Sequence, residues 1–210
     1  MNACGANNPN SCDFTNLITI IVGEDEQSFL VHKDMLCAKS KYFESACSEL
    51  WASGREKVVR PTQGTPKQFK MYSEWVYTSR LNVDAEDPNQ QLAELIGMFI
   101  LGDFLNDHQL RNATMDCLIT TILGSTHVFG LDQLDRIYAE TPASSPLRRF
   151  AVWWVLANVS RKDLESSITQ YPAELVQELA LAALKQTPVF NDKDSVRVLR
   201  AIIKPEKESV

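Results

Sequence analysis

The chain has 210 residues, 44% of them apolar and 23% charged, so it can bury a sizeable core and is not globally disordered. Its formal net charge of −6, with no lysine or arginine run longer than two, argues against a nucleic-acid contact spread over the surface. The five cysteines are odd in number and form no C-x-x-C pair, which argues against a disulfide framework and a zinc knuckle.

The N-terminal part of the chain predicts an arm followed by a small sheet. Residues 1–15 are polar and rich in asparagine, and they lack the basic start and apolar core of a signal peptide. The β-branched run LITIIV (17–22) predicts a strand, which the turn GEDE connects to a second strand, SFLV (28–31). KVVR (57–60) predicts a third short strand, closed by Pro61.

Capping residues mark the first helices. Ser40 is a candidate N-cap ahead of residues 41–50, and Thr65 and Gln68 have the spacing of a capping box around a proline at the first helical position. Side chains with helical spacing are expected on the core-facing side of these segments: Met35, Leu36, Phe69, Tyr72 and Val76.

Further helices are predicted to follow up to Pro205. Asp87, Asp107, Ser145 and Tyr171 precede helical patterns, and the segment after Ser145 is apolar nearly all round, so it should be buried. Its apolar run, residues 150–157, is too short for a membrane span. The predicted apolar stripes are Leu92, Leu95, Ile96 and Phe99; Leu110, Ala113, Cys117 and Thr121; Leu131, Leu134, Ile137 and Tyr138; Leu175, Val176, Leu179 and Leu184; and Val196, Leu199, Ile202 and Ile203. Early strands and later helices together predict a mainly helical α+β fold.

Residue patterns typical of catalysis are missing. His32 and Cys37 lie five residues apart, which places them on poorly matched helix faces, and no third orienting group is evident. His108 and His127 lie near helix boundaries, where structural or exposed histidines are common. No glycine-rich phosphate loop and no repeated metal-ligand spacing occurs. We therefore expect no enzyme, no cofactor and no metal.

Four stretches in order read FLVHK (29–33), ML (35–36), SKYF (40–43) and EWVYTSRL (74–81). Their order and separation resemble a BTB/POZ domain, and residues 97–119 are similar to the helical pair that completes that fold. Residues 137–154 and 171–180 resemble the C-terminal extension of filamentous-fungal BTB proteins.

This resemblance implies a short three-stranded sheet capped by helices and followed by a helical extension. The implied domain limits are a flexible arm at 1–15, a BTB/POZ domain at 16–123, the extension at 124–204 and a tail at 205–210. It also implies structural roles for Phe29, Val31, His32, Leu36, Ser40, Tyr42, Phe43, Trp75 and Tyr77. Family members often dimerise through the first strand and first helix, which implies an interaction surface at Leu17, Lys33, Asp34 and Met35.

The function implied by the resemblance is a non-catalytic protein-interaction module. It would self-associate as a homodimer and serve as a substrate adaptor for a cullin-type ubiquitin ligase, with protein partners, no direct nucleic acid and no membrane. The alternatives are a partner-dependent transcription or chromatin factor and, more remotely, an unrecognised hydrolase. Trp51, Trp153 and Trp154 are candidate partner-binding aromatics, and core packing is the alternative for Trp153 and Trp154. We expect an intracellular location, cytoplasmic, nuclear or both.

Overall fold

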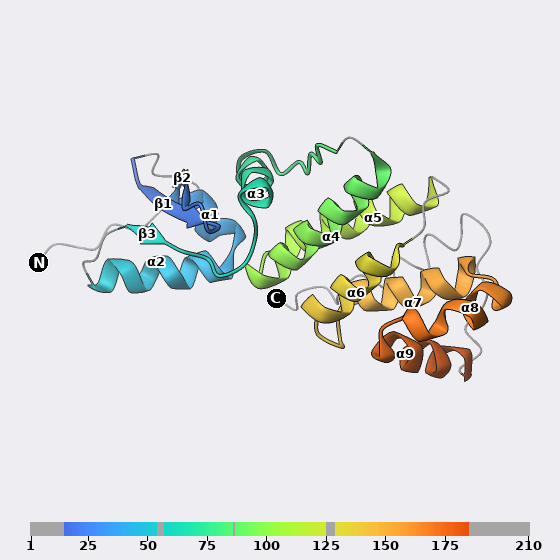
Figure 1. Ribbon diagram of the computed structural model, residues 1–210. Coiled ribbons are helices and arrows are strands. Elements are labelled where there is room, and N and C mark those ends of the chain that lie inside the picture. Colours follow the sequence, from blue (N-terminus) through green and yellow to red (C-terminus); the bar gives the residue numbers. More distant parts are fainter. Residues whose placement is uncertain (1–14, 54–56, 86, 125–128, 185–210) are drawn as a thin grey trace, which may run out of the picture. The chain divides into compact units, whose positions relative to one another are not determined.

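The computed structural model describes residues 15–53, 57–85, 87–124 and 129–184 (Figure 1). Residues 1–14 of the arm predicted at 1–15 lie outside these ranges, as do His127, the last predicted helix (Val196 to Ile203) and the tail. The side chain of Trp51 also lies outside the described part. The elements in chain order are β1 (Leu17–Val22), β2 (Gln27–His32), α1 (Lys33–Lys39), α2 (Lys41–Ser53), β3 (Val58–Val59), α3 (Pro66–Thr78), α4 (Pro88–Phe104), α5 (His108–Leu123), α6 (Leu131–Glu140), α7 (Pro146–Asn158), α8 (Arg161–Ser167), the 3-10 turn η1 (Ile168–Gln170) and α9 (Ala173–Leu184).

The mainly helical α+β fold predicted from the sequence is confirmed. The chain divides into two compact units. The first combines residues up to Asp84 with Gly97–Arg111, and the second combines Ala85–Ile96 with the chain from Asn112 onward, so α4 and α5 contribute to both. The domain limits 16–123 and 124–204 stay a prediction.

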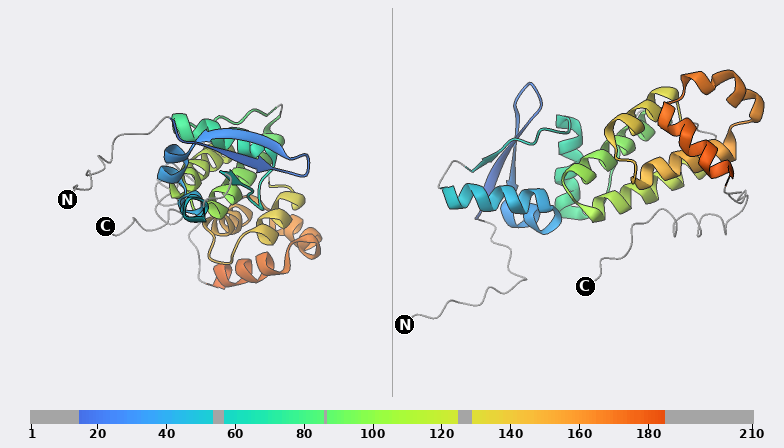
Figure 2. Two further views of the ribbon diagram at one scale, coloured as in Figure 1. Left: turned by 90° about the vertical axis from the view of Figure 1, so that its left-hand side faces the viewer. Right: turned by 90° about the horizontal axis from the view of Figure 1, so that it is seen from below.

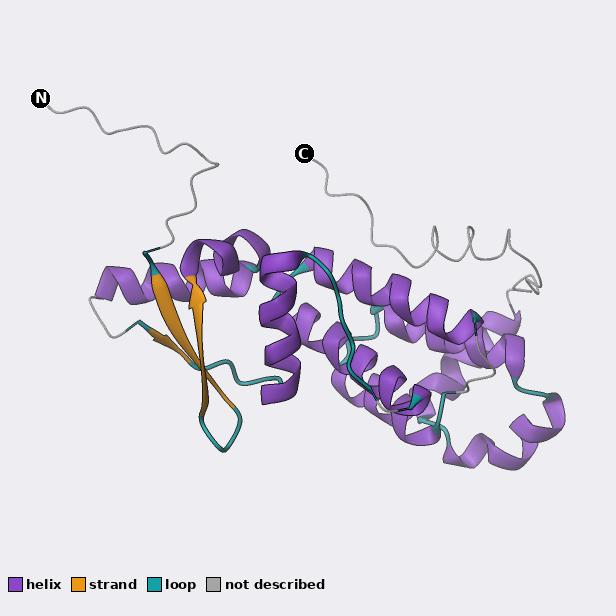
Figure 3. Ribbon diagram, turned by 90° about the horizontal axis from the view of Figure 1, so that it is seen from above, coloured by secondary structure: helices purple, strands orange, loops and turns teal. Residues whose placement is uncertain are grey.

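The sheet of the first unit has the strand order β2-β1-β3, with β1 antiparallel to β2 and parallel to β3 (Figure 3). Side chains alternate between the two faces of a strand, and Ile18, Ile20, Val22 and Val31 occupy the buried face. The hairpin turn requires a positive φ at Gly23 (80°), where a Cβ would lie only 3.0 Å from Cγ of Pro66. The predicted strands and their hairpin are thus confirmed.

Aromatic side chains from β2, α2 and α3 form the centre of the first unit. Ring centroids of Phe69 lie 5.4 Å from Phe29, 6.1 Å from Phe43 and 5.6 Å from Tyr72. The predicted caps hold these helices in place: Ser40 Oγ accepts the Phe43 N–H at 3.2 Å and donates to the Leu105 carbonyl at 2.6 Å. Thr65 and Gln68 form the predicted capping box at the start of α3.

Asp107 connects α3 to the start of α5. One carboxylate oxygen accepts the Leu110 N–H at 2.9 Å, as an N-cap should, and the other accepts the Trp75 indole N–H at 3.0 Å. The residue is fully buried. Burial raises the pKa of the Asp107 carboxyl, although both hydrogen bonds oppose the shift.

The predicted apolar stripe of α5 is correct at Leu110, which is buried, and wrong at its other three positions. Ala113, Cys117 and Thr121 are only partly buried, whereas Thr114, Met115, Leu118, Ile119 and Ile122 are buried. The buried set lies one position further along the helix and contains larger apolar side chains, which gain more free energy from burial than alanine, cysteine or threonine do.

Helices α6 to α9 of the second unit lie together in both views of Figure 2. The apolar segment of α7 is largely buried up to Val155, as predicted, whereas Leu156 at its C-terminal end is exposed. Trp154 packs edge-on against Phe129, with ring centroids 5.3 Å apart. Core packing is therefore confirmed for Trp154. Trp153 is only partly buried and stacks on Phe150 of the same helix, with ring centroids 5.9 Å apart. Helix α8 was not predicted, although Ser160 caps it by accepting the Asp163 N–H at 3.2 Å.

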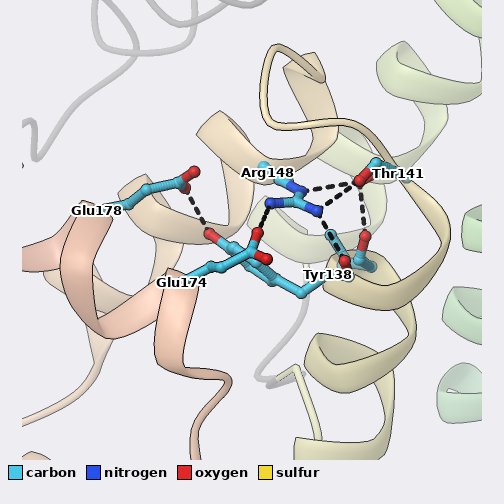
Figure 4. A network of polar contacts seen from close by, with 6 residues as sticks. Tyr138, Thr141, Arg148, Glu174 and Glu178 are labelled. Atoms are coloured by element: carbon cyan, nitrogen blue, oxygen red, sulfur yellow. Dashed lines mark hydrogen bonds and ion pairs between the residues drawn. The ribbon is translucent and has the colours of Figure 1, made fainter.

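Arg148 of α7 is 95% buried and holds α6 and α9 through its guanidinium (Figure 4). It donates to the Tyr138 carbonyl at 2.7 Å and to both oxygens of Thr141, and it pairs with Glu174 of α9. The guanidinium carbon lies 4.6 Å from the Tyr138 ring centroid, and the Tyr138 hydroxyl donates to Glu178 at 2.6 Å. Burial, followed by the hydrogen bond to Glu178, raises the pKa of Tyr138.

We expect Asp107→Asn to change how stability depends on pH. Because the native pKa of Asp107 is raised, the native state binds more protons than the unfolded state between the ordinary carboxyl pKa and the native one. The free energy of unfolding therefore falls as pH rises through that window, and the asparagine variant lacks this fall. Urea unfolding of both proteins from about pH 3.5 to 7 measures the difference. Parallel pH profiles would contradict the raised pKa.

We expect Arg148→Met to destabilise the protein far more than Glu174→Gln. Removing the buried cation leaves the Tyr138 and Thr141 carbonyls without their donor, which costs about 2–4 kcal/mol. The Glu174 side chain is 62% exposed, so water replaces the lost pairing at a cost of about 0–1 kcal/mol. Denaturant unfolding measures both costs. Equal costs would show that the ion pair with Glu174, rather than the carbonyl contacts at the end of α6, accounts for the stability that Arg148 provides.

Candidate protein-interaction surface

The outer face of the β1–β2 hairpin carries exposed apolar side chains. The register pairs Leu17 with His32 and Thr19 with Leu30, so these four residues point away from the buried face. Leu30 is 64% exposed, and Tyr77 at the end of α3 is 45% exposed. We call these five residues the hairpin surface.

His32 and Tyr77 close one end of the hairpin surface. The Tyr77 hydroxyl oxygen accepts the His32 backbone N–H at 3.1 Å and lies 2.8 Å from His32 Nδ1. The two rings meet edge to face, with centroids 5.7 Å apart. His32 is therefore a hydrogen-bonded residue of the strand–helix connection, as the sequence predicts.

Leu17 lies next to the start of α1. The Lys33 N–H donates to the Asn16 carbonyl at 2.8 Å, which continues the β1–β2 pairing up to the first residue of the helix. Leu17, Lys33, Asp34 and Met35 are all partly buried. The structure thus brings together the four residues predicted to form the interaction surface, in a group we call the strand–helix junction. Whether this junction binds a partner stays a prediction.

The residues predicted to be structural occupy the core or its border. Val31, Leu36, Ser40, Phe43 and Trp75 are buried, and Phe29, His32 and Tyr42 are partly buried. Tyr77 is the exception, because it is 45% exposed, although its ring and its hydroxyl both contact His32.

Sequence reasoning did not single out Leu30 as a surface residue. The signal was present, because Val31 was expected in the core and its neighbour in a strand must then face the other way. Strand alternation over residues 29–32 therefore predicts that Leu30 points outward, although its two neighbours are also apolar.

The geometry gives no support to a Cys/His nucleophile. The Cys37 thiol donates to the Phe43 carbonyl at 3.6 Å, and its contact with Cys47, followed by burial, raises the pKa of the Cys37 thiol. His32 is engaged by Tyr77 instead. At the start of α5, the exposed His108 has its Nδ1 2.6 Å from Arg111 Nη2.

The described residues contain neither a metal-binding cluster nor a membrane-spanning helix. Within residues 15–53, 57–85, 87–124 and 129–184, no group of three or more His, Cys, Asp or Glu residues is placed to hold a metal ion. Every helix in these ranges is too short or too polar to cross a bilayer.

Comparison with known proteins identifies the fold. The family model of the BTB/POZ domain matches residues 7–117, which is more than half of the chain. The chain belongs to the BTB/POZ domain family. The three-stranded mixed sheet with its surrounding helices is therefore a BTB fold, followed by further helices to α9.

Among solved structures, the chain is similar to the BTB domain of zebrafish PATZ1. The two are 26% identical over 51% of this chain and 75% of that one, with a TM-score of 0.35. No curated protein matches the chain. BTB/POZ domains mediate protein–protein interactions and are typically non-catalytic, so protein binding is the function that family membership supports.

We expect the His32 and Tyr77 side chains to be energetically coupled. Tyr77→Phe removes the hydroxyl, and His32→Ala removes the ring that it contacts at 2.8 Å. In a double-mutant cycle measured by denaturant unfolding, the coupling should be about 0.5–1 kcal/mol, because the pair is partly open to water. A coupling near zero would mean that the hydroxyl stabilises only the His32 backbone N–H.

Proposed function

We propose that the chain is a non-catalytic adaptor that self-associates through the strand–helix junction and presents substrates to a cullin-type ubiquitin ligase. The observation that carries self-association is the convergence of Leu17 with Lys33, Asp34 and Met35 at one place on the surface of the first unit. Membership of the BTB/POZ family supports a role in protein binding. Dimerisation at this junction and the contact with a cullin are what we propose in addition.

The C-terminal helices supply the surface for the substrate in this proposal. Trp154 is buried and Trp153 is partly buried, so exposed aliphatic side chains take the place of the expected aromatic contacts. Leu156 is 37% exposed, Ile168 is 38% exposed and Leu181 is 57% exposed. Exposed aliphatic side chains of this kind are suited to the apolar centre of a protein contact. The likeness of residues 137–154 and 171–180 to filamentous-fungal relatives supports the same assignment.

Light scattering on a sizing column tests the proposal. We expect a dimer over a range of protein concentrations, and a larger complex when the N-terminal domain of a cullin is added. Leu17→Glu should convert the dimer to a monomer, because it buries a charge at the contact. Leu181→Glu is the matched control, since it changes an equally large apolar side chain on α9 and should leave the dimer intact.

Circular dichroism of both variants establishes that each is folded. A wild-type monomer that ignores the cullin would contradict both the dimer and the ligase role. A dimer that persists in Leu17→Glu would place the contact away from the strand–helix junction. A dimer without a cullin complex would leave self-association and remove the ligase role.

A further inference from the structure

Strand β2 is an edge of the sheet, and some of its main-chain groups have no hydrogen-bond partner among the residues that the structure describes. Hydrogen-bonded and non-hydrogen-bonded residue pairs alternate along an antiparallel ladder. Because the Lys33 N–H donates to the Asn16 carbonyl, every second pair from there is bonded, and Gln27, Phe29 and Val31 direct their main-chain groups toward β1. Ser28 and Leu30 then direct theirs away from it. Among the described residues, none bonds to these outward groups. The open stretch ends at His32, whose N–H is taken by Tyr77.

The β2 edge lacks the features that usually protect an edge strand. Its sequence, QSFLVH, has no charge and no proline, and unprotected edges of this kind pair readily with another strand. The opposite edge, β3, has only two residues and is followed by Arg60 and Pro61. Of the two edges of this sheet, β2 is therefore the one that is suited to pairing with another strand.

The inner side chains of β2 are packed in the core, and its outer face carries the exposed side chain of Leu30. Phe29 packs on Phe69 of α3, and Val31 is buried, so the strand is fixed before any partner arrives. Leu30 carries two of the outward main-chain groups itself, and it is 64% exposed. A strand added to β2 would cover Leu30 with its own apolar side chain on the outer face.

The charge beside the edge selects the partner. The turn before β2 contains Glu24, Asp25 and Glu26, all exposed, and the one ion pair that these acids make within the described residues is the 3.8 Å contact between Glu26 and Arg60. A basic partner therefore lowers the electrostatic energy here, whereas a second copy of a chain with net charge −6 raises it.

We propose that the β2 edge binds an extended segment of a partner protein as an additional antiparallel strand. The segment places an apolar side chain against Leu30 and basic residues beside the Glu24–Glu26 turn. Since the partner strand runs opposite to β2, its basic residues follow its apolar ones in sequence. This inference rests on the proposed function only in that the chain binds proteins, because it uses a different surface from the strand–helix junction.

Fluorescence anisotropy with a synthetic peptide tests the proposal on the full chain. The probe is a labelled peptide of alternating threonine and valine that ends in Lys-Arg-Lys. Two control peptides leave the protein unchanged: one ends in Glu-Asp-Glu, and one is N-methylated at the positions that face β2. Each control should bind at least about tenfold more weakly, because it loses the charge attraction or the main-chain hydrogen bonds.

Variants of the chain locate the site. Ser28→Pro removes an N–H that points away from β1, so it leaves the hairpin ladder complete while blocking the added strand. It should weaken peptide binding at least about tenfold, whereas the matched Ser28→Ala, which keeps the N–H, should bind within about twofold of wild type. Glu24→Gln combined with Asp25→Asn should weaken binding at low salt without touching the strand.

The outcomes separate this inference from the proposed function. Tight binding of the probe that is lost in Ser28→Pro and kept in Leu17→Glu supports the β2 edge whatever the oligomeric state. Equal binding by the N-methylated peptide, or by Ser28→Pro and Ser28→Ala, overturns it, as does no binding at millimolar peptide. Self-association that Ser28→Pro abolishes would also overturn it, because a second copy would then be the occupant.

Discussion

The register between β1 and β2 determines the roles of all twelve residues in the hairpin. With Leu17 opposite His32, the side chains of Ile18, Ile20 and Val31 face the core, and those of Leu17 and Leu30 face outward. A slip by one residue would expose Ile18 and Ile20 and bury Thr19, so burial of the inner face holds the register in place. The same register decides that Ser28 and Leu30 turn their main-chain groups away from β1. Core, surface and open edge are therefore consequences of one pairing.

Two buried charged groups hold helices in place, and they do so differently. Asp107 is the N-cap of α5, and its carboxylate also accepts a hydrogen bond from the Trp75 indole N–H. One carboxylate therefore fixes both the start of a helix and a core aromatic side chain. Arg148 donates to carbonyls at the end of α6, and it also pairs with Glu174, which is largely exposed. In both, a neighbouring backbone group depends on the charged side chain for its hydrogen bond. Such groups favour one arrangement over others of similar apolar content, because every alternative leaves a buried donor or acceptor unpaired.

Local signals in the sequence predicted much of the fold. The capping residues Ser40, Thr65 and Ser145 precede helices as expected, and the β-branched run 17–22 forms strand β1. Beyond Leu110, the α5 stripe failed because several spacings of apolar residues compete on that helix, and only the packed neighbours select one. The Trp75–Asp107 bond joins residues 32 apart, and Arg148 reaches Glu174 across 26. Contacts between such distant positions leave no periodic signal in a single sequence.

The same limits apply to the interaction surface. Leu17 and Lys33 to Met35 could be named beforehand because a family resemblance pointed to them, and their convergence is visible only once the strands pair. The β2 edge has no residue motif at all, since its groups belong to the main chain. Nearly any side chain at Ser28 preserves those groups, whereas proline removes one. A surface of this kind tolerates sequence change that would destroy a side-chain site, so it is found by working out where each backbone N–H and C=O is directed.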